Sequence, residues 1–161
     1  MIVFNFQVSR KGIARKSYNR SFREEFKNTL LYAVQYWHEK ILPRHFYVSA
    51  HGKYRHQRRD AEWVQNKRKK GRGQGKFIDL LFKGTARRWL THNPQYSATS
   101  RLGKVKMEAP PYFVKPNEKN PGSQPDKVAE LKLITRDERQ EMAKRIHKHL
   151  IRQIKQAEKK R

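Results

Sequence analysis

Residues 21–41, with the sequence SFREEFKNTLLYAVQYWHEKI, contain the longest helical pattern in the first half of the chain. Its apolar side chains recur every three or four residues and so share one face of a helix: Phe22, Phe26, Leu30, Ala33, Val34, Trp37 and Ile41. Ser21 and Glu24 have the spacing of a capping box, which satisfies free amides at a helix start. The pattern predicts a long amphipathic helix that ends before Pro43.

A second long helix is expected near the end of the sequence. Thr135 and Glu138 repeat the capping-box spacing, and apolar residues follow at four-residue steps: Met142, Ile146, Leu150 and Ile154. Alternating apolar and polar residues predict four strands: 2–8, 46–50, 104–109 and 129–133. Three further segments are a helical turn or loop, a short helix and a Pro-rich loop: 60–70, 85–90 and 115–126.

These elements predict a single α+β domain over residues 1–161, with two long amphipathic helices packed on a small, mostly antiparallel sheet. The aromatic residues at helical spacing are expected in its core: Phe22, Phe26, Trp37 and Trp89. Apolar residues make up 35% of the chain and charged residues 33%. The core is therefore thin for the length, and extended arms or contacts with partners are expected.

The charge balance points to an anionic partner. The formal net charge is +25, and there is no cysteine, which excludes disulfides and cysteine-based zinc sites. No apolar run is long enough to cross a bilayer, so no membrane partner is expected. The N-terminal segment lacks the charged start of a signal peptide.

The strongest charge signal is a basic, glycine-containing arm at residues 51–76, where ten Lys or Arg stand against Asp60 and Glu62. Its cations are candidate contacts to an anionic partner: Lys53, Arg55, Arg58, Arg59, Lys67, Arg68, Lys69, Lys70 and Arg72. Tyr54 and Trp63 lie among these charges and are candidates for stacking on bases. Two interpretations stay open, a nucleic-acid backbone and an acidic protein surface. Specific base reading is not expected, because no known reading element is present.

No motif supports catalysis, a metal or a cofactor. The seven histidines have no HExxH spacing, and no paired carboxylates stand at helical spacing beside them. Residues 71–75 hold three glycines but lack the Gly-Lys-Ser/Thr of a phosphate-binding loop, so a hinge is the better interpretation. We expect surface or packing histidines and no enzyme activity.

The order of several segments carries a family resemblance: LPRHF at 42–46, the Tyr/Arg/Lys-rich stretch 54–70, FIDLLFKG at 77–84, Arg87-Arg88, APPY at 109–112 and DKVAEL at 126–131. In this layout the chain resembles the neck and tail-completion (head–tail joining) proteins of tailed bacteriophages, the group that includes the minor tail protein Z type. The resemblance covers roughly residues 21–155.

The resemblance implies a structural subunit of the virion, made in the host cytoplasm and assembled at the head–tail junction. Its implied partners are further copies of itself in a hexameric or dodecameric ring, connector or portal-side proteins, tail proteins and packaged double-stranded DNA. It supplies no functional residues, so the candidates above rest on charge and exposure. Two alternatives remain: a sequence-independent nucleic-acid-binding module associated with ribosomes or DNA, and a small basic nuclease or toxin.

Overall fold

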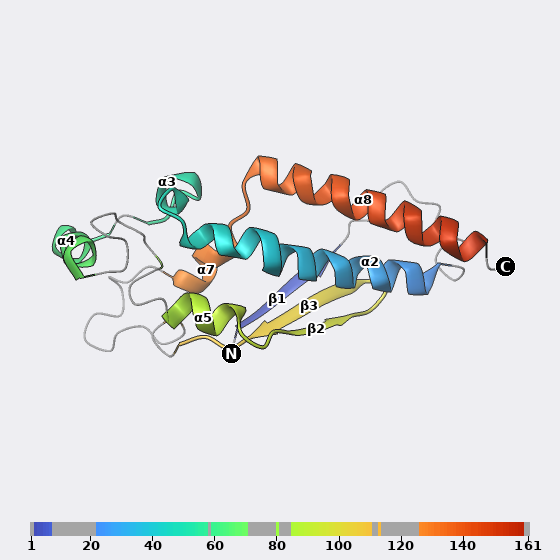
Figure 1. Ribbon diagram of the computed structural model, residues 1–161, viewed down its shortest axis with the longest axis horizontal. Helices are drawn as coiled ribbons and strands as arrows, with labels where there is room; N and C mark the ends of the chain where they lie inside the picture. Colours follow the sequence, from blue (N-terminus) through green and yellow to red (C-terminus); the bar gives the residue numbers. More distant parts are fainter. Residues whose placement is uncertain are drawn as a thin grey trace.

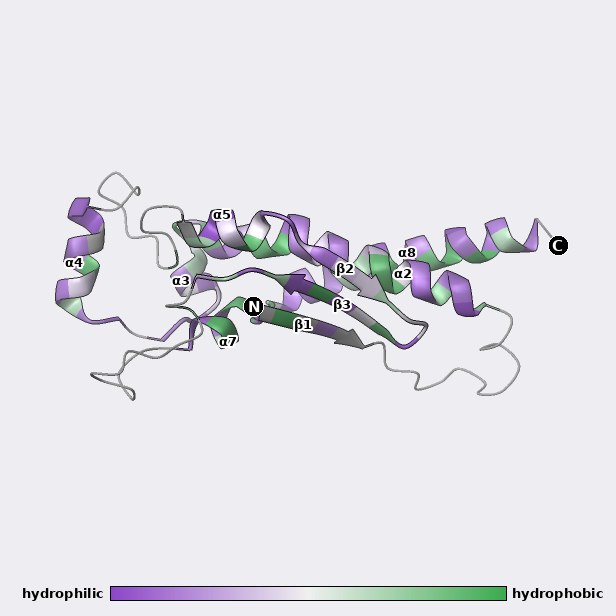
Figure 2. Cartoon of the chain, turned by 90° about the horizontal axis from the view of Figure 1, so that it is seen from below, coloured by the Kyte–Doolittle hydropathy of each residue, from purple (hydrophilic) through white to green (hydrophobic). Residues whose placement is uncertain are grey.

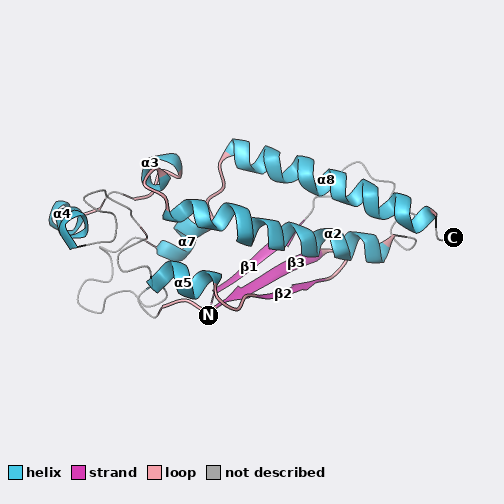
Figure 3. Cartoon of the chain, viewed as in Figure 1, coloured by secondary structure: helices cyan, strands magenta, loops and turns pink. Residues whose placement is uncertain are grey.

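The computed structural model describes residues 2–7, 22–57, 59–70, 80, 85–110, 113 and 126–159. Three layers lie one on another: a small sheet, helix α2 (Arg23–Tyr36) and helix α8 (Arg136–Glu158), as Figure 1 shows. Figure 3 colours the same view by element type. The predicted α+β class, with long helices over a small antiparallel sheet, is confirmed.

The sheet has three antiparallel strands in the order β1–β3–β2. Their bounds are Ile2–Gln7 for β1, Gln95–Ala98 for β2 and Leu102–Met107 for β3. The central strand β3 pairs Val105 with Phe4 on one side and with Tyr96 on the other. The strands expected at 2–8 and 104–109 are thus present within one or two residues, whereas β2 was not predicted.

Helix α2 lies directly against β3, and Gly103 permits this close approach. A Cβ atom at Gly103 would lie 2.8 Å from both the Leu30 carbonyl oxygen and Val34 Cγ1. Buried side chains alternate along β3, so Val105 and Met107 face the helix. The helix begins after Phe22, which makes no side-chain cap. Ser21 of the predicted capping box lies outside the described residues.

The long helix changes geometry at its end. A π-helical turn, η1 (Trp37–Ile41), follows α2, and a 3-10 turn, η2 (Leu42–Phe46), follows η1. Within η1, the buried ring of His38 makes a hydrogen bond on both sides, with Tyr96 Oη at 2.8 Å from Nδ1 and the Leu90 carbonyl at 2.8 Å from Nε2. Because a carbonyl only accepts, Nε2 carries the proton and Nδ1 accepts from Tyr96.

Helix α8 packs along the side of α2 that faces away from the sheet (Figure 1). Its predicted capping box is present: the Thr135 hydroxyl accepts from the Glu138 amide, and the Glu138 carboxylate accepts from the Thr135 amide. Met142 is buried, and the ring of His149 stacks on Tyr32 with centroids 4.3 Å apart. Both predicted long helices therefore pack on the core through one face.

Two predicted strands are absent: one lies largely in a helix, and the other forms a turn between two short helices. Residues 129–133 fall largely in α7 (Lys127–Leu131), because Asp126 caps its start by accepting from the amides of Val128 and Ala129. Residues 46–50 join η2 to α3 (Ala50–Lys53), and the short alternating patterns at these places did not distinguish strand from helix.

The remaining elements agree with the sequence patterns in part. Residues 60–70 form a full helix, α4 (Ala61–Lys70), and the expected short helix is α5 (Thr85–Thr91). Trp89, expected in the core, is 38% exposed, while Trp37 is fully buried and Phe22 and Phe26 are half-buried. The glycine hinge at 71–75 and the Pro-rich loop up to residue 125 lie outside the described residues.

Candidate functional site

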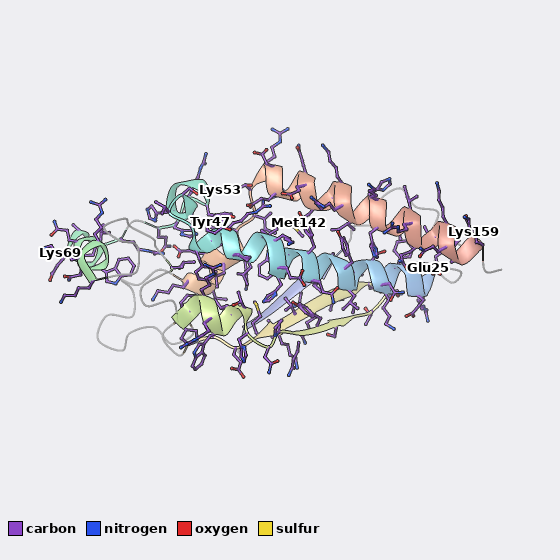
Figure 4. The ribbon with its side chains drawn as sticks, viewed as in Figure 1. Glu25, Tyr47, Lys53, Lys69, Met142 and Lys159 are labelled. Atoms are coloured by element: carbon purple, nitrogen blue, oxygen red, sulfur yellow. The ribbon has the colours of Figure 1, made fainter. Side chains whose placement is uncertain are left out.

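Helix α4 stands clear of the layered body of the protein, at one end of the molecule (Figure 1, Figure 4). Asp60 caps it: its carboxylate accepts from the Trp63 amide at 3.0 Å, and its carbonyl accepts from the Val64 amide at 3.0 Å. Val64 is half-buried, and every other side chain described on α4 is exposed. A helix of this length gains little stability by itself in water.

The last turn of α4 carries a run of four cations, residues 67–70. Arg68, Lys69 and Lys70 are exposed. Successive residues of an α-helix are about 100° apart around its axis, so these charges surround the helix end and do not form a single stripe. Trp63, 36% exposed, lies one turn earlier. The end of α4 therefore attracts polyanions from several directions, but these cations do not distinguish one base sequence from another.

Three of the predicted contact residues, Lys53, Tyr54 and Arg59, lie at the base of the arm and bond to acidic residues of α7 and α8. Tyr54 is 4% exposed, so the prediction that it stacks on a partner is wrong. Its ring stacks on His45 with centroids 3.8 Å apart, and its hydroxyl donates to Glu138 at 2.7 Å. Burial, followed by the hydrogen bond to Glu138, raises the pKa of the Tyr54 phenol. Tyr54 thus anchors α3 to the start of α8.

Glu138 is the centre of this anchor, with only 2% of its surface exposed. Its carboxylate accepts from Lys53 Nζ at 2.5 Å and from Arg44 Nη1 at 3.3 Å, in addition to the Tyr54 hydroxyl and the Thr135 amide. Burial opposes ionisation, but the hydrogen bonds from Lys53 and Tyr54 outweigh it and lower the pKa of Glu138 to about 2. Lys53 thus pairs with Glu138, but 36% of its side chain stays exposed, and its role as a partner contact remains a prediction.

Arg59 is likewise part of the interior and is 9% exposed, so its predicted role as a contact is wrong. Its Nη2 lies 2.5 Å from Glu130 Oε2 in α7. The other carboxylate oxygen of Glu130 accepts from the Gln57 amide at 3.0 Å. This pair ties the chain just before α4 to α7, and the Glu138 cluster ties α3 to α8.

His45 completes the buried polar cluster. Desolvation, strengthened by the neighbouring His56, lowers the pKa of His45 to about 3. The Leu133 backbone lies close enough to favour the charged ring slightly, yet neither ring nitrogen has a hydrogen bond of normal geometry to the described residues. Within those residues, no group of three or more His, Asp or Glu is arranged to hold a metal ion. The stacked rings of His45 and Tyr54 and the hydrogen bond from Tyr54 to Glu138 fix the base of the arm.

The predicted contacts thus fall into two groups. Lys53, Tyr54 and Arg59 bond to acidic residues of the body, and the other predicted contacts whose side chains are described are exposed. Arg55 is exposed, with a left-handed backbone φ of 51°, and joins the outward-facing residues of α4. Lys67 is described through its backbone alone, and Arg58 and Arg72 lie outside the described residues.

Sequence reasoning missed the anchoring roles of Arg44, Glu130 and Glu138. Of these three residues, only Glu138 had a recognisable sequence pattern, its capping-box spacing. That spacing does not reveal that Glu138 also accepts hydrogen bonds from Lys53 and Tyr54.

None of the helices in the described ranges is both long and apolar enough to span a membrane. Comparison of this chain with protein-family models, with curated proteins and with solved structures finds no match.

Proposed function

We propose that this chain is a structural subunit of the head–tail junction of a tailed bacteriophage, which assembles as a ring around the DNA channel and joins the head connector to the tail. The resemblance of residues 21–155 to neck and tail-completion proteins supplies the family. The observation that carries the proposal is the basic helix α4, held outside the core on a base fixed by the buried pair Arg59–Glu130 and by the partly exposed pair Lys53–Glu138.

This geometry suits a subunit that reaches a neighbour. An arm that moved freely would lose conformational entropy on contact, and an anchored base lowers that cost. The exposed cations of α4 match two surfaces expected at such a junction, the phosphates of packaged DNA and acidic faces of connector or tail proteins. No chemical step is required of the protein in this role.

The test is assembly. Mass photometry and negative-stain electron microscopy of the purified chain, with and without the connector of the same phage, should show a closed ring of defined stoichiometry that adds to the connector. A chain that stays monomeric under both conditions, and that does not bind connector or tail, would contradict the proposal.

A second candidate function is sequence-independent nucleic-acid binding by the free monomer. The observation that favours it is the exposed Trp63 one turn before the basic end of α4, because an aromatic ring beside cations is typical of sequence-tolerant nucleic-acid contacts. Salt-sensitive affinity of the monomer for unrelated DNA and RNA sequences, without ring formation, would support this function over the first.

A further inference from the structure

The face of the sheet that points away from α2 carries a short cationic row. Burial alternates along β3, so Lys104 and Lys106 lie opposite the face that packs on the helix. In the view from below, no described helix is drawn over β1 and β3 (Figure 2). The residues paired with these lysines are Asn5 and Ser97 for Lys104, and Val3 and Gln95 for Lys106.

The two lysines form no ion pair within the described part of the chain, although the Glu108 carboxylate follows two positions after Lys106. No carboxylate there forms an ion pair with Lys104 or Lys106, and each stays half-buried on the sheet. Residues two apart on a strand lie about 6.8 Å apart, which is comparable to the spacing of successive phosphates on a nucleic-acid strand. Two like charges at this spacing repel one another unless an anion lies across them.

Beyond Lys106 the chain reaches a cleft that is lined in part by the side chain of Trp89. Glu108 follows two residues after Lys106 and lines a shallow cleft of about 240 Å³ together with Arg88, Trp89 and His92. Arg88, Trp89 and His92 lie on one helical turn at the end of α5, because the His92 amide donates a hydrogen bond to the Arg88 carbonyl at 2.9 Å. Trp89 is 38% exposed, although nearby Leu90 is fully buried.

The geometry points to a binding site for single-stranded nucleic acid, in which one base stacks on Trp89 and the following phosphates lie over Lys106 and Lys104. An exposed indole next to a cationic track is the arrangement by which proteins hold unpaired strands. Arg88 and His92 supply further N–H donors at the cleft. The Glu108 carboxylate disfavours a phosphate there but accepts from the exocyclic amino group of a base.

This chemistry defines the ligand further. Thymine has no exocyclic amino group, so strands of cytosine or adenine should bind better than strands of thymine. Duplex DNA keeps its bases stacked and paired, and it offers none to the indole. The site is separate from α4 and does not depend on the proposed place at the head–tail junction.

Fluorescence anisotropy of the full chain with a short labelled oligodeoxycytidine tests the stacking step. Trp89→Ala should weaken binding by roughly 5- to 150-fold, the effect of losing one stacked base, while Trp89→Phe should retain most of the affinity. Tyr47→Ala, which removes an aromatic side chain that is 52% exposed at another site, is the matched control and should leave the affinity unchanged. Circular dichroism establishes that each variant is folded.

The charge and base preferences are tested in the same assay. Lys104→Gln with Lys106→Gln should lower the log–log salt slope by about 1.4, from roughly 0.7 per phosphate on a single strand, and Lys144→Gln with Lys155→Gln on α8 should not. Glu108→Ala should reduce the preference for cytosine over thymine. The inference is overturned if Trp89→Ala binds the oligonucleotide like the parent, if it loses duplex binding equally, or if both lysine pairs lower the slope alike.

Discussion

The guanidinium of Arg59 and the carboxylate of Glu130 form an ion pair across 71 positions of sequence, with 2.5 Å between Nη2 and Oε2. Both side chains are almost fully buried, at 4% and 6% exposure. The pair fixes the chain immediately before α4, so it decides where the basic helix is held.

Removing one partner of this pair should be costly. Glu130→Gln leaves the guanidinium buried without its anion, so the free energy of unfolding should fall by about 3–5 kcal/mol. Replacing both partners, Arg59→Met with Glu130→Leu, should recover most of that loss, because no uncompensated charge remains. Chemical denaturation measures both variants. Glu24→Gln, at an exposed pair with Lys27, is the control and should cost less than about 1 kcal/mol.

Gly103 should tolerate no side chain without loss of stability. In Gly103→Ala the new methyl group lies 2.8 Å from the Leu30 carbonyl, which belongs to helix backbone and must shift. We expect a loss of about 1–3 kcal/mol in the free energy of unfolding, typical of an overfilled core. Gly52→Ala in α3 is the matched control: its new methyl group would meet nothing within 4 Å, and alanine favours a helix by up to about 1 kcal/mol. Equal losses at the two glycines would contradict the close packing of α2 on β3.

Acid should destabilise the protein in two stages. The folded pKa of His45, about 3, lies below the value of 6.5 for a free histidine, so the unfolded chain takes up more protons as pH falls below 6.5. Stability should therefore decrease by up to about 1.4 kcal/mol per pH unit. Glu138, with a pKa of about 2, contributes a further loss only below its ordinary value of 4.5.

Between pH 6.5 and 4.5 the loss comes from His45 and from His149, whose pKa is also lowered by burial, before Glu138 contributes. His45→Phe keeps an aromatic ring against Tyr54 but removes the titrating group, so the slope of unfolding free energy against pH should flatten in this window. His147→Phe, at an exposed histidine of α8, is the control for replacing an imidazole with a phenyl ring. A parent-like slope in His45→Phe would mean that other groups govern the acid response.

The basic end of α4 should matter for binding and little for folding. Replacing residues 67–70 with Gln removes four positive charges, and exposed substitutions usually change stability by less than about 0.5 kcal/mol each. If all four cations contact phosphates of duplex DNA, the log–log salt slope should fall by about 3.6. If an acidic protein is the partner, connector or tail attachment should weaken while DNA affinity stays the same.

A charge-matched control exists on α8, where four exposed cations can be replaced by Gln in the same way: Arg139, Lys144, Lys148 and Lys155. Equal effects of the two quadruple variants would show that overall charge governs binding. A quadruple α4 variant that binds DNA and assembles like the parent would remove α4 from the binding surface.

The periodic parts of the sequence predicted the scaffold well. The stripe of apolar residues that includes Leu30 and Val34 indicated α2, and Thr135 with Glu138 placed the start of α8. Ile146, midway along α8, is half-buried, whereas Leu30 is 2% exposed, so truncation to Ala should cost less at Ile146. A three- or four-residue spacing identifies a helix face without revealing how deeply each position is covered.

The buried contacts at the base of the arm could not be predicted from the sequence, and the reason is physical. Tyr54 and Arg59 were expected to be exposed because they stand in a run of cations, but their partners Glu138 and Glu130 lie 84 and 71 positions away. Alternation at 129–133 likewise suggested a strand, since nothing local indicates that Glu130 must turn inward. Long-range pairing of buried charges leaves no periodic trace in a sequence.

The π-helical turn at Trp37–Ile41 sets the direction of everything that follows it. The amide of Leu42 reaches back five residues, to the Trp37 carbonyl, so this turn holds one more residue than an α-helical turn would. Deleting the exposed Glu39 would let the amide now at Leu42 bond to the same carbonyl from four positions away, as in a regular α-helix, so the downstream chain would keep its direction. Arg44 would then still lie against Glu138 and Glu141 of α8. A deletion within α2 would instead turn every later residue of the helix by about 100°, so the wide turn is a place where the chain can lose one amino acid and still hold the arm as before.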